Sequence, residues 1–411
     1  MLDIKTKSSG CSTAITIVAA ALLALGVVMV FSATASLTSP PVTDNPLRNP
    51  SLRQALFTGI ALVALLLVRL CPYQSWRIRK GTFFQPAIYL LILAIAALVA
   101  VLLVGEDRNG AKRWLSVGPA SLGLGFQPSE VAKLALVIFL AAYCGRIGQR
   151  IRLFWSGFLP AVLTLGLVAG LIGIEDFGTA ALLVTVGACL LLCAGVKIWH
   201  FCLAGLPAIA GLVYLVLARP YRIERLTAFL DPYADPLGKS YHQIQSLITI
   251  ASGGWWGHGL GCGIQKYGYL PEGRNDFIFA VICEELGLIG GIAVIGLFAI
   301  FLWQGKRAAA NASSEFGRLL ALGATLMIGF QAAMNIAVVT VAAPTKGIGL
   351  PFVSAGGSGV LLLSVLVGLL ANVARHDAGG STAARCIPLR APPAASGVGC
   401  PGAIPDGAAP T

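Results

Sequence analysis

Long apolar runs separated by short polar segments dominate the pattern of this chain. Ten runs come close to the ~20 residues that a helix needs to cross the hydrocarbon core of a bilayer. Because backbone groups in lipid must be satisfied within their own segment, we expect each run to be a helix; the alternating pattern of a membrane-spanning strand is absent. The runs lie near residues 13–31, 52–70, 86–104, 130–144, 157–174, 178–195, 199–217, 276–302, 316–342 and 356–374. The pattern predicts an all-α polytopic membrane protein with about ten transmembrane helices.

Composition supports the same class. Hydrophobic residues make up 57% of the chain, charged residues 11%, and the mean hydropathy is +0.83. A soluble globular domain carries about 25% charged residues, so these values exclude one. A cleaved signal peptide is the alternative for residues 1–35, because Ala33, Thr34 and Ala35 resemble a cleavage site. The length of the first run, and the nine runs after it, favour a retained helix.

The distribution of basic residues predicts the orientation. If the N-terminus is cytoplasmic, the inner segments carry most of the Lys and Arg outside the long seventh loop, as the positive-inside rule requires. We therefore expect residues 1–12 in the cytoplasm, a transmembrane domain over 13–375, and a large extracytoplasmic loop over 219–275. The tail over 376–411 is rich in Ala, Pro and Gly and is predicted to be disordered and cytoplasmic. The net charge of +12 reflects this topology and does not indicate nucleic-acid binding.

Two pairs of charged residues lie near the outer end of the fourth run. One pair precedes the run, and the other lies within its first turn. Lys112 and Arg113 offer cations next to an interfacial tryptophan. Glu130 and Lys133 are three residues apart, so their side chains can meet on one helix face. The alternatives are structural: Lys112 and Arg113 would anchor the chain at the lipid headgroups, and the start of the fourth run would form a helix cap. The position of Lys133, one turn inside the span, favours a functional role.

The large outer loop concentrates charge at a membrane boundary, which indicates chemistry or the binding of a charged lipid. Arg222 and Lys266 are among its cations. The glycines over 253–263 have the composition of a phosphate-cradling loop, although a flexible re-entrant surface fits them equally well. His242 and His258 are candidate imidazoles, and neither is favoured as catalytic.

Asp276 begins the eighth run on the outer side. A carboxylate at a helix N-terminus is stabilised by the helix dipole, so a plain cap is one interpretation. Glu284 and Glu285 lie deeper in the same run, where buried acids need partners or protonation. Lys133 is the basic residue that lies well inside a predicted span.

The segment over 343–358 separates the last two runs and is punctuated by prolines, glycines and Lys346. Such a sequence predicts a bent, partly re-entrant loop whose backbone amides and lysine could meet an anion. A plain connecting loop is the alternative.

Several long motifs resemble the SEDS family, whose members are named FtsW, RodA and SpoVE. They cover residues 13–375 in the order of the family, and the wording of QKYGYLPE and PYRIERLTAFLDPYADPLG is most similar to the FtsW and SpoVE branch. The other motifs are GAKRWLSVG, FQPSEVAKLAL, YHQIQSLITIASGG, NDFIFAVICEELGLIGG and PTKGIGLPFVSAGGS.

The resemblance implies a peptidoglycan glycosyltransferase that polymerises lipid II at the outer face of the bacterial cytoplasmic membrane. It also implies a class B penicillin-binding protein and other division-complex membrane proteins as partners, and enrichment at the division site. The essential acid of the family corresponds to Asp276. This chain departs from the family at Arg274 and Asn275, and again over 354–359, where local hydrogen bonding should differ.

The implied chemistry explains why one acid suffices. A diphosphate-linked sugar already carries a good leaving group, so a general base for the acceptor hydroxyl is what remains, and Asp276 is our candidate. Cations, with or without a divalent metal such as Mg²⁺ or Mn²⁺, would stabilise charge on the diphosphate. A lipid II flippase and a scaffold that recruits its partner are the alternatives. Glu284 and Glu285 are expected to form a structural polar pair in the membrane. The expected substrate-binding residues are Lys112, Arg113, Glu130, Lys133, Arg222, Lys266, Lys346, Ser354 and Ser358.

Overall fold

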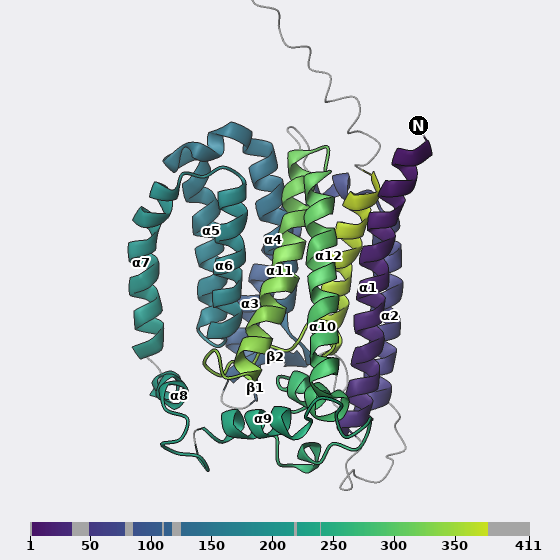
Figure 1. Cartoon of the computed structure of the whole chain (residues 1–411). Helices are drawn as coiled ribbons and strands as arrows, with labels where there is room; N and C mark the ends of the chain where they lie inside the picture. Colours follow the sequence, from purple (N-terminus) through teal and green to yellow (C-terminus); the bar gives the residue numbers. More distant parts are fainter. Residues whose placement is uncertain are drawn as a thin grey trace, which may run out of the picture.

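The computed structural model describes residues 2–34, 49–78, 85–108, 111–116, 125–217, 220–238 and 240–376. Long helices correspond to all ten apolar runs and stand side by side in one bundle (Figure 1). They are α1 (Leu2–Thr34), α2 (Pro50–Leu70), α3 (Pro86–Val104), α4 (Pro128–Ile147), α5 (Leu159–Gly173), α6 (Phe177–Cys193), α7 (Ile198–Leu217), α10 (Ile278–Ala310), α11 (Glu315–Val339) and α12 (Gly357–His376).

The predicted class is confirmed: the protein is a mostly helical, polytopic membrane protein. Within the described residues, eight helices are long and apolar enough to cross a membrane. Two shorter apolar helices are Phe177–Cys193 and the Ile198–Pro207 part of α7. The tail predicted from residue 376 lies, from 377 on, outside the described residues.

Local signals in the sequence mark where several helices begin. Proline occupies one of the first two positions of α2, α3, α4 and α5, where its missing N–H costs no hydrogen bond. Asn49 caps α2 by accepting from the Ser51 amide at 3.0 Å. Ser314 caps α11 by accepting from the Gly317 amide at the same distance.

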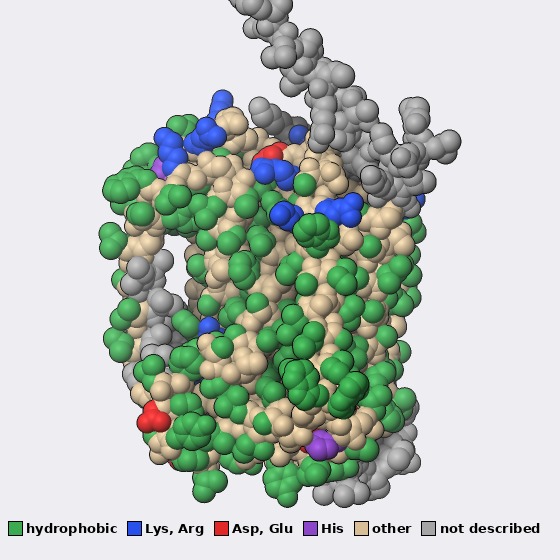
Figure 2. All heavy atoms as spheres, viewed as in Figure 1, with side chains coloured by type: hydrophobic (Ala, Val, Ile, Leu, Met, Phe, Trp, Pro, Cys, Tyr) green, Lys and Arg blue, Asp and Glu red, His purple; other side chains and the backbone are tan. Residues whose placement is uncertain are grey.

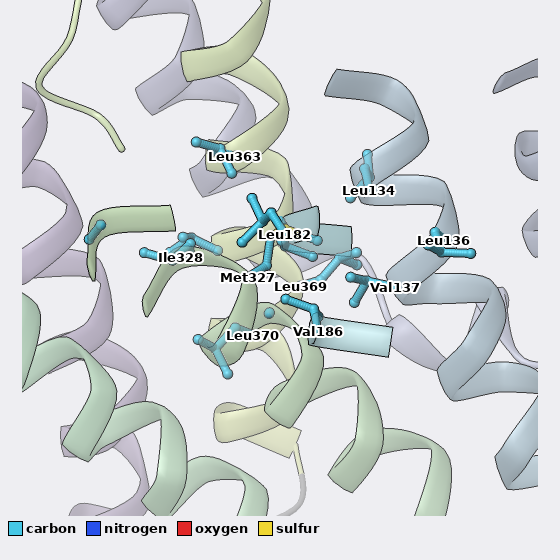
Figure 3. Close-up of a cluster of buried hydrophobic side chains, with 14 of the residues drawn as sticks. Leu134, Leu136, Val137, Leu182, Val186, Met327, Ile328, Leu363, Leu369 and Leu370 are labelled. Carbon is cyan, nitrogen blue, oxygen red and sulfur yellow. The ribbon is translucent and has the colours of Figure 1, made fainter. Parts of the chain in front are cut away.

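The hydrophobic core runs through the middle of the bundle, where α4, α6, α11 and α12 pack together (Figure 3). Small residues allow the closest contacts: a Cβ on Gly368 of α12 would lie 2.9 Å from the Leu65 carbonyl of α2. Side chains that fill this core are Leu134, Leu136, Val137, Leu182, Val186, Met327, Ile328, Leu363, Leu369 and Leu370.

The two ends of the bundle differ in chemistry. Ser12 of α1 donates to the Ala371 carbonyl of α12 at 2.8 Å, so the chain enters and leaves the bundle at one end. Figure 2 shows most Lys and Arg side chains of the viewed face at that end, above an apolar flank. This arrangement agrees with the expected cytoplasmic end, and the orientation in the membrane stays a prediction.

Smaller elements cover the opposite end. The large loop contains helices α8 (Pro220–Leu230) and α9 (Tyr241–Ser252) and the 3₁₀ turn η6 (Gln265–Tyr267), which the sequence analysis did not foresee. The strands β1 (Glu106–Arg108), β2 (Ala111–Ser116) and β3 (Gly125–Phe126) form a small antiparallel sheet nearby, in the order β1-β2-β3 (Figure 1). The remaining short turns are η2 (Tyr73–Trp76), η4 (Gly148–Arg152) and η5 (Phe154–Phe158).

Helix α10 is broken at Gly287, which has a φ of 72°. Glycine adopts such a positive φ readily because it has no Cβ. The glycine-rich segment over 253–263 inserts at this break and satisfies the freed backbone groups. His258 N donates to the Glu284 carbonyl at 3.0 Å, and Leu288 N donates to the Gly254 carbonyl at 2.9 Å. The glycine-rich segment therefore binds protein backbone at the break of α10.

Glu284 and Glu285, the two acids expected to have a structural role in the membrane, each bind a different part of the outer loop. Glu284 accepts from the Ile264 and Gln265 amides at 2.8 and 3.1 Å. Glu285 accepts from Lys266 at 2.9 Å, and both side chains are 1% exposed or less.

The expected role of Lys266 as a substrate-binding residue is wrong, because its ammonium is buried among protein groups. Its ammonium donates to the Gly261 carbonyl at 2.7 Å and to the Ser32 hydroxyl of α1 at 3.3 Å. Ser32 in turn donates to Glu285 at 2.6 Å. A buried carboxylate requires such partners, so this cluster ties the outer loop to α1 and α10.

Replacing Lys266 by Met should leave the Glu285 carboxylate buried without its cation. We expect the Lys266→Met protein in detergent to lose about 3–5 kcal/mol of stability. The loss should appear as a lower midpoint of thermal unfolding, followed by tryptophan fluorescence. The double variant Lys266→Met/Glu285→Leu should recover most of it. Arg318→Met removes a half-exposed ion pair with Glu315 and is the matched control, expected to cost less than about 1 kcal/mol. Equal midpoints for the two single variants would contradict this account.

Candidate active site

Asp276 lies directly before α10, at the end of the bundle that α8 and α9 cover. Its side chain is partly buried. The Asn335 amide of α11 holds the backbone, donating to the Asp276 carbonyl at 2.7 Å and to the Ile348 carbonyl at 2.8 Å. One buried side chain therefore joins the acid-bearing segment to the loop between α11 and α12.

The same loop is fastened to the residues before Asp276. The Ser354 hydroxyl donates to the Asn275 carbonyl at 2.6 Å and accepts from the Leu350 amide at 2.6 Å. Ala355 N donates to the Arg274 carbonyl at 3.0 Å. Ser354, expected as a substrate-binding residue, is 6% exposed and instead positions the backbone around Asp276.

Arg113 reaches the site from strand β2. Its Nε and Nη2 donate to the Glu175 carbonyl at 3.0 and 2.6 Å, and its Nη1 lies 3.9 Å from Asp176 Oδ2. Asp176 is itself fixed as the cap of α6, where it accepts from Thr179 N at 3.1 Å. The turn between α5 and α6 thus sets the direction of the guanidinium.

Gly347 separates Arg113 from Asp276. A Cβ on Gly347 would lie 3.4 Å from Asp276 Oδ2 and 3.6 Å from Arg113 Nη1, so both groups border one small space. The neighbouring Lys346 places its ammonium 5.5 Å from the centre of the Phe177 ring. The Arg225 guanidinium of α8 donates to the Thr345 carbonyl at 3.4 Å. Three cations therefore surround the loop beside the acid.

The electrostatics of this cluster favour a carboxylate that titrates near neutral pH. Burial raises the pKa of Asp276 to about 7, and the neighbouring carboxylates of Glu272 and Asp176 act in the same direction. Arg113 and Arg225 oppose them. Burial also lowers the pKa of Lys346, against the influence of Asp176.

The expected contact between Glu130 and Lys133 is present, with 2.8 Å between Oε1 and Nζ. Lys133 is 3% exposed and also donates to Gln331 Oε1 at 3.0 Å. Gln331 Nε2 donates to the Gly349 carbonyl at 3.1 Å. The pair is therefore linked to the loop beside Asp276 through one side chain of α11.

The remaining expected site residues are Lys112, Ser358 and Arg222. Lys112 is exposed, and its backbone amide donates to Glu175 Oε2 at 3.0 Å. The hydroxyl of Ser358 at the start of α12 is buried and has no hydrogen-bond partner within the described residues. The side chain of Arg222 is outside the described part of the chain.

Four residues of this cluster escaped the sequence analysis: Asp176, Arg225, Gln331 and Asn335. Asp176 was visible only as a polar break between the fifth and sixth runs. A single Gln or Asn within an apolar run has a weak signal, because its partners come from distant segments.

Metal ligation was left open by the sequence. Among the described residues, no group of three or more His, Cys, Asp or Glu side chains is arranged to hold a metal ion. The divalent cation considered from the resemblance stays a prediction.

Similar proteins are found by sequence. Stage V sporulation protein E of Bacillus subtilis is 39% identical over 376 residues, covering 90% of this chain and 99% of that protein. A probable peptidoglycan glycosyltransferase FtsW of Thioalkalivibrio sulfidiphilus is 43% identical over 363 residues, covering 87% of each.

Solved structures share the fold. A chain of a peptidoglycan synthase complex matches with a TM-score of 0.67 and 29% identity, over 88% of this chain and 96% of that one. The rod-shape-determining protein RodA of Thermus thermophilus matches with a TM-score of 0.60 and 26% identity, over 88% and 96%. The family model of the FtsW/RodA/SpoVE cell cycle proteins matches residues 12–379. On this evidence the chain belongs to the FtsW/RodA/SpoVE family, the SEDS family to which its motifs pointed.

Proposed function

We propose that this protein is a peptidoglycan glycosyltransferase that polymerises lipid II into glycan strands at the outer face of the cytoplasmic membrane. The observation that carries the proposal is Asp276, a partly buried carboxylate with a pKa of about 7 that borders one space with Arg113. The names of the relatives, probable peptidoglycan glycosyltransferase FtsW among them, support the same activity.

Asp276 acts as the general base in this proposal. It takes the proton from the acceptor sugar hydroxyl as that oxygen attacks the anomeric carbon of the donor. The bond from this carbon to the diphosphate breaks, and the lipid diphosphate leaves with the electron pair. A base whose pKa lies near the working pH combines a useful ionised fraction with a useful basicity.

The cations explain why the proposed mechanism needs no second catalytic acid. A diphosphate leaves as an anion, so positive charge can replace the proton that a poorer leaving group needs. Arg113 borders the space beside Asp276 from β2, Arg225 of α8 binds the nearby Thr345 carbonyl, and Lys346 comes from the same loop as Thr345. A planar guanidinium suits phosphate oxygens because it offers two parallel donors.

We place the activity in cell division, together with a class B penicillin-binding protein and other membrane proteins of the division complex. The description of the family as cell cycle proteins supports the division role. The similarity to a chain of a peptidoglycan synthase complex supports such a partner. Enrichment at the division site follows from that role.

A lipid II flippase is the alternative, since charges within a membrane bundle suit a polar pathway. In this chain the charges behind that idea already have protein partners. Glu285 pairs with Lys266, Glu284 binds backbone amides, and Glu130 pairs with Lys133. These contacts favour static roles in the fold, and therefore the transferase.

Asp276→Asn should abolish the proton transfer without removing the surrounding contacts. We expect polymerisation of lipid II to fall by at least about 100-fold, while lipid II binding and the thermal midpoint stay unchanged. The assay uses purified protein with its penicillin-binding partner, whose transpeptidase is blocked. Asp231→Asn, at an exposed acid of the same outer loop, is the control and should retain activity. Equal glycan synthesis by both variants would remove Asp276 from the mechanism.

The rate should depend on pH in a defined direction. Asp276 is a base only when ionised, so kcat/KM should rise with pH through about 7. Asp176→Asn removes a negative charge that raises this pKa and should move the midpoint to lower pH. Glu315→Gln, at the other end of α11, should leave the profile unchanged. A pH profile that is flat through neutrality would argue against the assignment.

Gly347→Ala should place a methyl group between Asp276 and Arg113 at ordinary contact distances, so the fold should tolerate it. We expect glycan synthesis to fall by about tenfold or more, because the acceptor must enter that space and small misplacements of reacting groups are costly. Gly296→Ala is the matched control, since an added methyl there meets nothing within 4 Å. Full activity of Gly347→Ala would show that the acceptor approaches from elsewhere.

A further inference from the structure

An imidazole of helix α9 contacts the residue that follows the acid. The imidazole of His242 stacks on the ring of Phe277, with 6.0 Å between ring centres and 14° between planes. Phe277 directly follows Asp276 and is 5% exposed, whereas His242 is exposed. The exposed face of His242 is therefore an accessible aromatic surface, and the ring beneath it belongs to the residue next to the proposed base.

Helix α9 holds this imidazole on a rigid support. The Ser246 hydroxyl donates to the Val339 carbonyl of α11 at 2.7 Å. The Tyr241 hydroxyl donates to the Tyr269 carbonyl at 2.9 Å, which fixes the start of the helix. Gln243, Ser246 and Thr249 are all 1% exposed or less. A ring fixed in this way loses little conformational entropy when a ligand packs on it.

The charges around His242 are shared with the acid. Arg225 and Glu272 act on the imidazole, and the same two groups act on Asp276. Partial burial and Arg225 lower the pKa of His242, against the opposite influence of Glu272. The lowered pKa favours the uncharged form of the ring.

We propose that the exposed ring face of His242 is a stacking platform for a sugar ring of the lipid-linked substrate. This inference rests on the proposed function and assigns a further substrate contact to its site. The C–H groups on one face of a pyranose are apolar and pack well on a flat aromatic ring. The stack on Phe277 fixes the plane of the platform relative to Asp276, so it would orient the sugar as well as bind it.

Binding to the Asp276→Asn protein tests the platform without turnover. In that background, His242→Ala should weaken lipid II binding by about fivefold, and His242→Phe, which keeps a ring, should bind as tightly as His242. Polyprenyl diphosphate without sugars is the second probe, and His242→Ala should leave its affinity unchanged. His258→Ala, at the other exposed imidazole of the outer loop, is the control and should change neither affinity.

Two results would overturn the platform. One is unchanged lipid II affinity in His242→Ala. The other is an equal loss for both probes, which would place the defect in the diphosphate site or the fold of α9; a thermal midpoint for each variant separates these two causes. A separate measurement tests the proposed function. If that function is wrong, the wild-type protein makes no glycan strands, and this result does not depend on how the His242 variants bind lipid II.

Discussion

The interaction on which the outer half of this protein depends is the insertion of the glycine-rich segment into the break of α10. A helix that opens at Gly287 exposes carbonyl and amide groups inside an apolar bundle, where each unpaired group costs several kcal/mol. Backbone groups over 253–263 satisfy them, and the buried pair of Lys266 with Glu285 fastens the same loop. The start of α10, and with it Asp276, is consequently held from two sides.

A second set of contacts holds the loop between α11 and α12 in place beside the start of α10. Asn335 and Ser354 bind backbone groups, and Gln331 connects the loop to Lys133. The charged groups of the site thus come from several separate elements and loops, and side-chain contacts hold the loop between α11 and α12 in place among them. This arrangement suits electrostatic catalysis, in which donors and cations must already point at the reacting atoms.

The site combines one acid with several cations, and the balance between them determines its chemistry. Burial and nearby carboxylates make Asp276 more basic, whereas Arg113 and Arg225 limit that effect. Asp176 contributes twice, since it raises the pKa of Asp276 and directs Arg113. A carboxylate without these cations would be less ionised at neutral pH, and one without its neighbouring acids would be a weaker base.

The sequence by itself determined the class of fold, the ten helical runs, the position of Asp276 and the contact of Glu130 with Lys133. All depend on hydropathy, on spacing along one helix or on contiguous motifs, which a sequence displays directly. It misassigned Lys266 as a substrate ligand and did not identify the partners of Glu284 and Glu285. Only the tertiary structure decided these partners, along with Asp176 beside Arg113. Each contact joins segments far apart in the chain, and which long-range pairs meet depends on how the helices pack.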